Sequence, residues 1–180
     1  MNVILDVTRL VRVLIKGRTL TGIDRVTMAY VQHYGHSAQA FVRWSGRGWI
    51  LSHRQSKALF LWLANPGSIL AVRLILMKGI LANLIARRTL NNFLLNTGSI
   101  GLHSDYPRLI RTLAVKPIFF VHDIIPLIYP EFFVPGEDNR HKERLNYILS
   151  LASGIVTISE AKRQDLLHYF QQNNQLMPPA

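Results

Sequence analysis

Apolar residues along the chain fall into short runs separated by glycine, proline and polar residues. Continuous runs rich in β-branched or aromatic residues predict buried strands at 2–7, 92–102, 116–123 and 154–159. Apolar residues at helical spacing predict helices at 21–34, 106–115, 136–153 and 159–172. The polar, glycine-bearing stretch 8–20 is expected to be a loop, although its LVRVLI could extend or pair with the first strand.

The order of these segments indicates the fold class. QAFVRW and GWILS flank the turn-forming stretch SGRG, which predicts a short hairpin. Elsewhere strands alternate with helices, and this alternation predicts an α/β fold with a Rossmann-like, doubly wound and mainly parallel sheet. We expect one domain over residues 1–173 and a loose tail over 174–180. Ligands of such sheets gather outside the carboxyl ends of the strands.

Residues 58–90 form the most apolar part of the sequence and are also basic. The longest uncharged run, 58–72, is too short for a membrane-spanning helix and contains Asn65, Pro66 and Gly67. Arg73 and Lys78 interrupt the second half. We expect a helical insertion here, which either lies on an anionic membrane surface or simply covers the core.

The amino-acid composition narrows the class of protein and the kind of binding partner that we expect. Of 180 residues, 49% are hydrophobic and 17% charged, which excludes a disordered chain, and there is no cysteine for disulfides or thiolate chemistry. The net charge of +11 favours an anionic partner. We do not expect nucleic acid, because the basic residues are scattered and carry no known nucleic-acid signature.

His122 and Asp123 end the predicted strand 116–123, and they are the candidate catalytic residues. A histidine beside a carboxylate at a strand end can donate, accept or bind a ligand near neutral pH. The alternative is that Asp123 caps the next turn and His122 is a hydrogen-bonded core residue. Thr97, Gly98 and His103 should lie near the same edge. We expect no metal, because no His and Asp pair has metal-ligand spacing.

Two predicted helix starts are candidate binding sites for phosphate groups. Thr21 and Gly22 open one helix, with Arg25 one turn later, and backbone N–H groups there could hold an anion. Ser159 and Glu160 open another helix after a strand. In both places the alternative is an ordinary capped helix with solvated charges.

Four stretches, taken in order, resemble the N-terminal half of retaining glycosyltransferases of family 4, which have the two-domain GT-B architecture. They are ILDVTRL, TGIDRV, PIFFVHDIIPLIYPEFF and RLNYILSLASGIVTISEAKRQDL, and together they span roughly residues 3–167. The nearest subgroup builds bacterial surface polysaccharides such as lipopolysaccharide O-antigen or capsule.

The resemblance implies transfer of a sugar from a nucleotide-sugar to a glycan or lipid-linked acceptor, with the nucleotide-sugar as co-substrate and no other cofactor. It assigns His122, with Asp123 beside it, to the catalytic cleft near the transferred sugar. It assigns Gly22 to the loop that approaches the donor phosphates, and Ser159 and Glu160 to a turn at the cleft edge.

The resemblance also implies where the protein acts and what it needs. It predicts a cytoplasmic protein, peripheral at the inner face of the plasma membrane, where 58–90 docks. The family's second domain, with its Glu-x7-Glu motif, does not occur in this sequence. We therefore expect the polypeptide to be inactive alone, as a fragment, a truncated product or one half of a split enzyme. A non-catalytic membrane-surface module is the alternative function.

Overall fold

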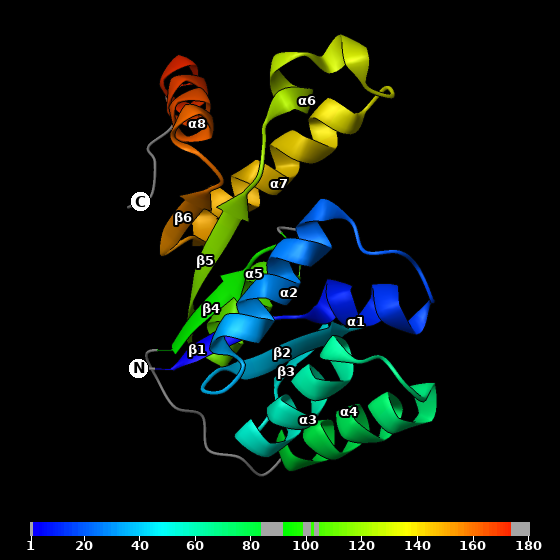
Figure 1. Ribbon diagram of the computed structural model, residues 1–180. Coiled ribbons are helices and arrows are strands. Elements are labelled where there is room, and N and C mark those ends of the chain that lie inside the picture. Colours follow the sequence, from blue (N-terminus) through cyan, green and yellow to red (C-terminus); the bar gives the residue numbers. More distant parts are fainter. Residues whose placement is uncertain (1, 84–91, 99–101, 103–104, 174–180) are drawn as a thin grey trace.

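The computed structural model of the protein describes residues 2–83, 92–98, 102 and 105–173. Six strands form one sheet in the order β3-β2-β1-β4-β5-β6 (Figure 1). All neighbouring strands are parallel except β2 and β3, and helices flank both faces. The predicted Rossmann-like, doubly wound and mainly parallel sheet is therefore confirmed. The strands are β1 (Val3–Asp6), β2 (Gln39–Trp44), β3 (Arg47–Ile50), β4 (Asn92–Asn96), β5 (Val115–Val121) and β6 (Gly154–Thr157).

Two hydrophobic clusters hold the helices on the sheet, one on each face. Successive strand residues point to opposite faces, so Ile4 belongs to one cluster and Leu5 to the other. The Leu5 cluster contains side chains of α1 (Thr8–Ile15), α2 (Gly22–Tyr34), α3 (His53–Ala64) and α4 (Ile69–Asn83). The Ile4 cluster contains side chains of α5 (Tyr106–Leu113), α7 (Glu137–Leu151) and α8 (Glu160–Gln172). A short helix, α6 (Ile125–Ile128), and a 3₁₀ turn, Pro130–Phe132, connect β5 to α7.

Residues 8–15 form helix α1, so the loop predicted for 8–20 is wrong over this part. The reason is an amphipathic pattern in which Leu10 and Val11 are buried against the sheet. Arg9, Arg12 and Lys16 recur at helical spacing on the polar side, where charges and helix are compatible. The β-branched residues that suggested a strand instead occupy the buried side of this helix.

The predicted hairpin is present as β2 and β3. Ser45 and Gly46 form its two-residue turn, and both have positive φ, 46° and 74°. This is the type I′ geometry, whose twist matches that of paired strands and which favours glycine. The last predicted strand, by contrast, is an edge strand: β6 pairs with β5, only Ile155 is buried in it, and Val156 is exposed.

The apolar region 58–90 contains two helices, α3 and α4, as far as residue 83. α3 packs on the sheet through a buried side that includes Leu59, Phe60 and Leu63. α4 packs beside α3 and against β3 and buries Val72, while its outer side stays exposed. Among the described helices, none combines the length and apolarity needed to cross a membrane. Residues 84–90 of this region, and the predicted tail 174–180, lie outside the described part of the chain.

Candidate functional site

The chain reverses its direction of strand addition between β1 and β4. From β1 it continues to β2 on one side, and later returns to place β4 on the other side. The loops leaving two such strands diverge, and the space between them is the usual ligand site of this fold. A cavity of about 210 Å³ lies there, with Asp6 at the end of β1 and Asn96 at the end of β4 among its lining residues.

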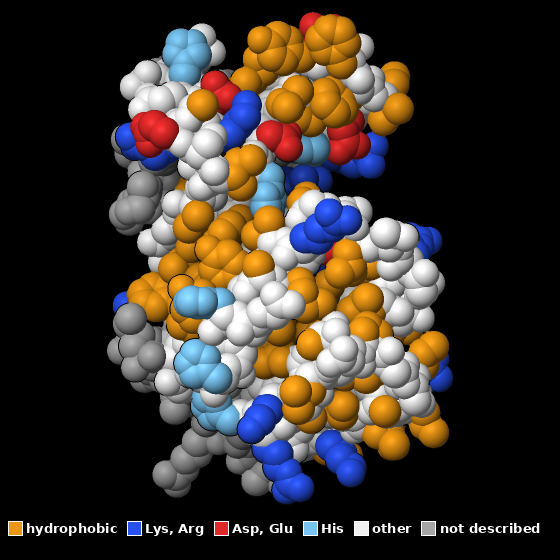
Figure 2. Space-filling model, in the orientation of Figure 1, with side chains coloured by type: hydrophobic (Ala, Val, Ile, Leu, Met, Phe, Trp, Pro, Cys, Tyr) orange, Lys and Arg blue, Asp and Glu red, His pale blue; other side chains and the backbone are white. Residues whose placement is uncertain are grey.

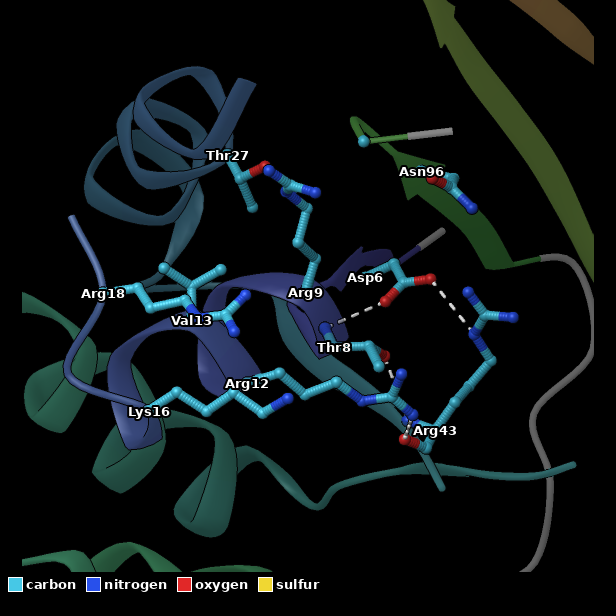
Figure 3. A pocket seen from close by; sticks show the side chains of 11 residues that line it. Asp6, Thr8, Arg9, Arg12, Val13, Lys16, Arg18, Thr27, Arg43 and Asn96 are labelled. Carbon is cyan, nitrogen blue, oxygen red and sulfur yellow. Dashed lines mark hydrogen bonds and ion pairs between the residues drawn. The ribbon is translucent and has the colours of Figure 1, made fainter. Parts of the chain in front are cut away.

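The lining of this switch-point cavity is strongly basic. Arg9, Arg12 and Lys16 come from α1 and its C-terminal end, Arg18 follows them, and Arg43 comes from β2 (Figure 3). Of the described residues that line it, Asp6 alone carries a carboxylate. The Asp6 carboxylate accepts a hydrogen bond from the Thr8 N–H at 3.0 Å and lies 3.6 Å from Arg43 Nε. This lining favours negative over positive charge in the cavity.

A buried ion pair connects α1 to the start of α2. Arg9 Nε donates to Asp24 Oδ1 at 2.7 Å, and the Asp24 side chain is 1% exposed. Asp24 Oδ2 also accepts from the Thr21 N–H at 2.9 Å and from the Thr21 hydroxyl. Burial raises the pKa of Asp24, but the hydrogen bonds from Arg9 and Thr21 outweigh it, so the net pKa lies below the ordinary value. Thr21 is thus engaged in capping α2.

Gly22 and Arg25 begin α2 on its exposed side. A methyl group placed on Gly22 would meet no atom within 4 Å, so the space beside its backbone is open. Arg25 is exposed as well. The next residue after Gly22, Ile23, lines a second cavity, which contains His122. The structure therefore brings the predicted helix start and the predicted catalytic histidine to the same region.

His122 lies at the carboxyl end of β5 in this second cavity, of about 100 Å³. Its Nε2 is 2.7 Å from the carbonyl oxygen of Thr97, which follows β4. A carbonyl only accepts, so Nε2 carries the proton and Nδ1 of the neutral ring is left as an acceptor. The Thr97 hydroxyl is itself 2.7 Å from the hydroxyl of Thr27 on α2. His122 is thus held by β4 while it remains only partly buried.

Asp123 is exposed and serves first as a local cap. Its Oδ1 accepts the Ile125 N–H at 3.3 Å, as the alternative interpretation of this residue predicted. Asp123 also acts electrostatically on two cations. The hydrogen bond to Asp165 raises the pKa of Lys162, and the nearby Asp123 carboxylate contributes less in the same direction. Burial lowers the pKa of Arg144, and Asp123 is among the carboxylates that oppose this.

His141 and Arg144 on α7 complete the wall of the His122 cavity. Arg144 Nη1 lies 3.4 Å from His141 Nε2, and arginine only donates, so Nε2 is the acceptor. The proton of His141 is then on Nδ1, which lies 3.1 Å from a carboxylate oxygen of Glu137. The cavity is therefore lined both by a half-buried guanidinium and by the imidazole of His122. This arrangement can bind hydroxyl groups and anions together.

Ser159 and Glu160 do not line either cavity. Ser159 Oγ accepts the Lys162 N–H at 3.2 Å and so caps α8. Glu160 is 66% exposed and accepts hydrogen bonds from Arg163 and Gln164 within the same helix. Their polar groups are occupied by the helix itself, as the alternative interpretation of this turn predicted. Ser159 nevertheless follows β6 at the same edge of the sheet as His122.

The switch-point cations and the α7 pair were not among the predicted site residues. A helical projection of residues 8–18 would have placed Arg9, Arg12 and Lys16 on one side, but the segment was assigned to a loop. Arg144 lies one turn after His141 and directly before Leu145, which is buried on the inner side of α7. His103 lies outside the described residues, whereas Gly98 borders both cavities.

In the described part of the chain, no three histidine or carboxylate side chains come together as ligands of a metal ion would. What the two cavities offer is a set of cations and an imidazole whose orientation is fixed by the Thr97 carbonyl. That set suits a ligand with hydroxyl and phosphate groups.

Comparison with known proteins adds no relative to this picture. No family model matches the chain, and neither the curated proteins nor the solved structures include a significant match.

Proposed function

We propose that the chain is the acceptor-side domain of a retaining glycosyltransferase of family 4. It would act in the transfer of a hexosyl group from a nucleotide-sugar to a glycan or lipid-linked acceptor during surface polysaccharide synthesis. The observation that carries the proposal is the His122 cavity, which lies at the carboxyl end of β5, borders the start of α2 and adjoins the switch point. The sequence resemblance described above supports the same assignment.

The geometry gives His122 a definite role in this proposal. Its Nε2 proton is held by the Thr97 carbonyl, so the ring cannot rotate freely and Nδ1 can accept a hydrogen bond from a sugar hydroxyl. Arg144, half-buried in the same cavity, supplies positive charge next to it. Gly22 leaves open space at the helix start, where a donor phosphate could approach the backbone.

Most of the donor site would belong to a second domain. In GT-B enzymes the donor nucleotide lies between two domains, and closure of the cleft excludes water from the reacting sugar. A donor-binding domain with the Glu-x7-Glu motif would therefore be required for catalysis. The proposed role of the present chain is to hold the acceptor and to present His122 to the transferred sugar.

The test is sugar transfer by the chain fused to, or mixed with, such a donor-binding domain. Labelled UDP-, GDP-, ADP- and dTDP-sugars are offered with a bacterial membrane lipid extract. His122→Ala should reduce transfer at least about tenfold, the value of a hydrogen bond that acts in the transition state. His36→Ala, on an exposed histidine at the other end of α2, is the matched control and should leave transfer unchanged.

Two outcomes would count against the proposal in different ways. An unchanged rate for His122→Ala would remove His122 from the mechanism while leaving the activity in place. An absence of transfer from all four donor classes, with both domains folded, would refute the function itself.

A second candidate is docking on an anionic membrane surface, without catalysis or in support of it. The observation that favours it is an apolar stripe on α4, defined by Leu70, Leu74, Met77 and Leu81, all exposed. Their spacing of four, three and four residues places them on one side of the helix. Arg73 and Lys78 on the same helix would contact lipid phosphates. In this proposal the protein is peripheral at the inner face of the plasma membrane.

A further inference from the structure

The switch-point cavity is lined by three further cations, besides Arg9 and Arg43, which are paired with Asp24 and Asp6. Within the described ranges, no Asp or Glu oxygen lies within 4.0 Å of the charged groups of Arg12, Lys16 or Arg18. Figure 3 shows Lys16 and Arg18 reaching along α1 from its end and from the segment after it, whereas the Arg12 side chain extends toward Arg43. Arg12 Nη2 donates to the Arg43 carbonyl at 3.2 Å, and its guanidinium lies over the Trp44 ring, so Arg12 keeps its positive charge but is held in place. Like charges that line one cavity repel one another, and an anion bound among them relieves this repulsion.

The other charges around this cavity are already compensated. Arg9 is bound to Asp24, and Arg43 lies 3.6 Å from Asp6. Asp6 also accepts the Thr8 N–H, so its negative charge is directed at the wall formed by β1, α1 and β2. The positive charge without an ion-pair partner among the described residues therefore lies on the exposed side of α1, at Arg12, and just after its C-terminal end, at Lys16 and Arg18.

An apolar groove begins at the same cations. The groove measures about 720 Å³ and lies between α1, the β2–β3 hairpin and α4. Arg12, Lys16 and Arg43 line both the groove and the cationic cavity. The rest of the groove lining is mostly apolar, and its main side chains are Val11, Ile15, Trp44, Trp49, Leu76, Met77 and Ile80.

The groove also opens along the exposed stripe of α4. Met77 belongs both to the groove lining and to that stripe (Figure 2 shows hydrophobic side chains gathered over α3 and α4). Arg73 adds a further cation on α4 at the groove. A volume of several hundred Å³ with an apolar lining and a charged end is typical of a site for an amphiphilic ligand.

We propose that this composite site binds a phosphate group carried by a hydrocarbon chain. The phosphate lies among Arg12, Lys16 and Arg18, and the chain follows the groove toward α4. Guanidinium and ammonium groups together form short, charge-assisted hydrogen bonds to phosphate oxygens. The hydrocarbon covers apolar surface that is otherwise exposed to water. The further step of identifying this lipid phosphate with the acceptor of the transferase rests on the proposed function. The binding of a lipid phosphate does not depend on that function.

Binding of simple alkyl phosphates by the full chain tests the proposal without any transferase activity. Octyl phosphate, butyl phosphate, inorganic phosphate and uncharged octyl glucoside are titrated below their micelle concentrations in a calorimeter. Each methylene buried in the groove is worth about fourfold in affinity. Octyl phosphate should therefore bind at least about tenfold more tightly than butyl phosphate, and inorganic phosphate more weakly still. Octyl glucoside should bind weakly, because it brings no charge to the cations.

Variants separate the two halves of the site. Lys16→Ala combined with Arg18→Ala should weaken octyl phosphate and inorganic phosphate alike, by about tenfold or more. The matched control is Arg108→Ala combined with Arg111→Ala, which removes the same charge from α5 on the other side of the sheet. This control should leave the affinity for both phosphates unchanged. Met77→Gln should weaken octyl phosphate and leave inorganic phosphate unchanged. All five positions are exposed, so the variants should fold, which thermal melts check.

Each remaining outcome overturns part or all of the proposal. Equal affinity for octyl and butyl phosphate would remove the groove and leave a site for a free, soluble phosphate. Equal weakening by the α1 and α5 variants would reduce the effect to net charge. An affinity for octyl glucoside equal to that for octyl phosphate would show that the groove binds alkyl chains without regard to the head group, and would refute the role of the cations. Octyl phosphate binding without any sugar transfer would refute the proposed enzyme function alone.

Discussion

Replacing Leu70 and Met77 by glutamine should release the protein from membranes, if the α4 stripe is a docking surface. The two side chains are 66% and 57% exposed, so together they offer slightly more than one complete apolar side chain to the bilayer. Burying such a side chain is worth about 2 kcal/mol. The double variant therefore loses about 2.5 kcal/mol of binding, or roughly 50-fold in the partition coefficient. Glutamine is a good helix former, so α4 itself should persist.

Liposome co-sedimentation with purified protein measures this partition coefficient. Vesicles with anionic lipid should bind more tightly than neutral ones, because Arg73 and Lys78 each add about 1 kcal/mol near a negative surface. The matched control is Phe132→Gln combined with Val134→Gln. Phe132 is 77% exposed and Val134 is 66% exposed, which is at least as much as Leu70, but both residues lie far from α4 in the sequence. The reasoning is refuted if the α4 variant binds like the wild type, or if the control variant loses as much.

Two further predictions concern stability. Asp24→Asn should lower the free energy of unfolding by about 2 kcal/mol at pH 7 in urea titrations, because Arg9 loses its buried partner and α2 its cap. The pKa of Asp24 is lower in the folded than in the unfolded protein, so its carboxylate stabilises the fold fully above the ordinary pKa of 3.8 and less as the pH falls below that value. The stability difference between wild type and variant should shrink in the same way. A difference that persists unchanged at pH 2 would contradict the role given to the Asp24 carboxylate. Gly79→Ala should destabilise by about 1 to 3 kcal/mol, because its new methyl would lie 2.6 Å from Leu51 Cδ2 in the contact between α4 and the sheet. The control is Gly67→Ala, whose new methyl would meet no atom within 4 Å and should leave stability unchanged. Thermal melts compare the two variants, and equal effects would contradict the packing argument.

The regular elements of the sheet could be predicted from local patterns. The strands ending at Asp6 and Val121 are continuous apolar runs, and the hairpin turn contains the small residues that positive φ demands. Helix α1 could not be identified in the same way. Its β-branched residues and the following glycine disfavour a helix when taken alone, whereas the amphipathic spacing that buries Leu10 and Val11 becomes visible only when the segment is projected as a helix.

The candidate site was predictable only in part, for the same physical reason. His122 stood out because a titratable pair interrupts an apolar run, and the structure places it in a cavity. The cationic cavity depends on residues from α1 and β2 that converge through the sheet order, and sequence spacing does not reveal this convergence. Ser159 and Glu160 show the opposite case, because a helix cap and a ligand site have the same local sequence.

Amide chemical shifts of the ¹⁵N-labelled chain test most directly the claim that ligands bind along the carboxyl edge of the sheet. Titration with octyl phosphate, and then with nucleotide-sugars, should shift Arg12, Arg18, Gly98 and His122, which border the two cavities. Ala114 and Ser153 precede β5 and β6 at the opposite edge, and their signals should stay in place. Shifts confined to that opposite edge, or none at millimolar ligand, would contradict the account.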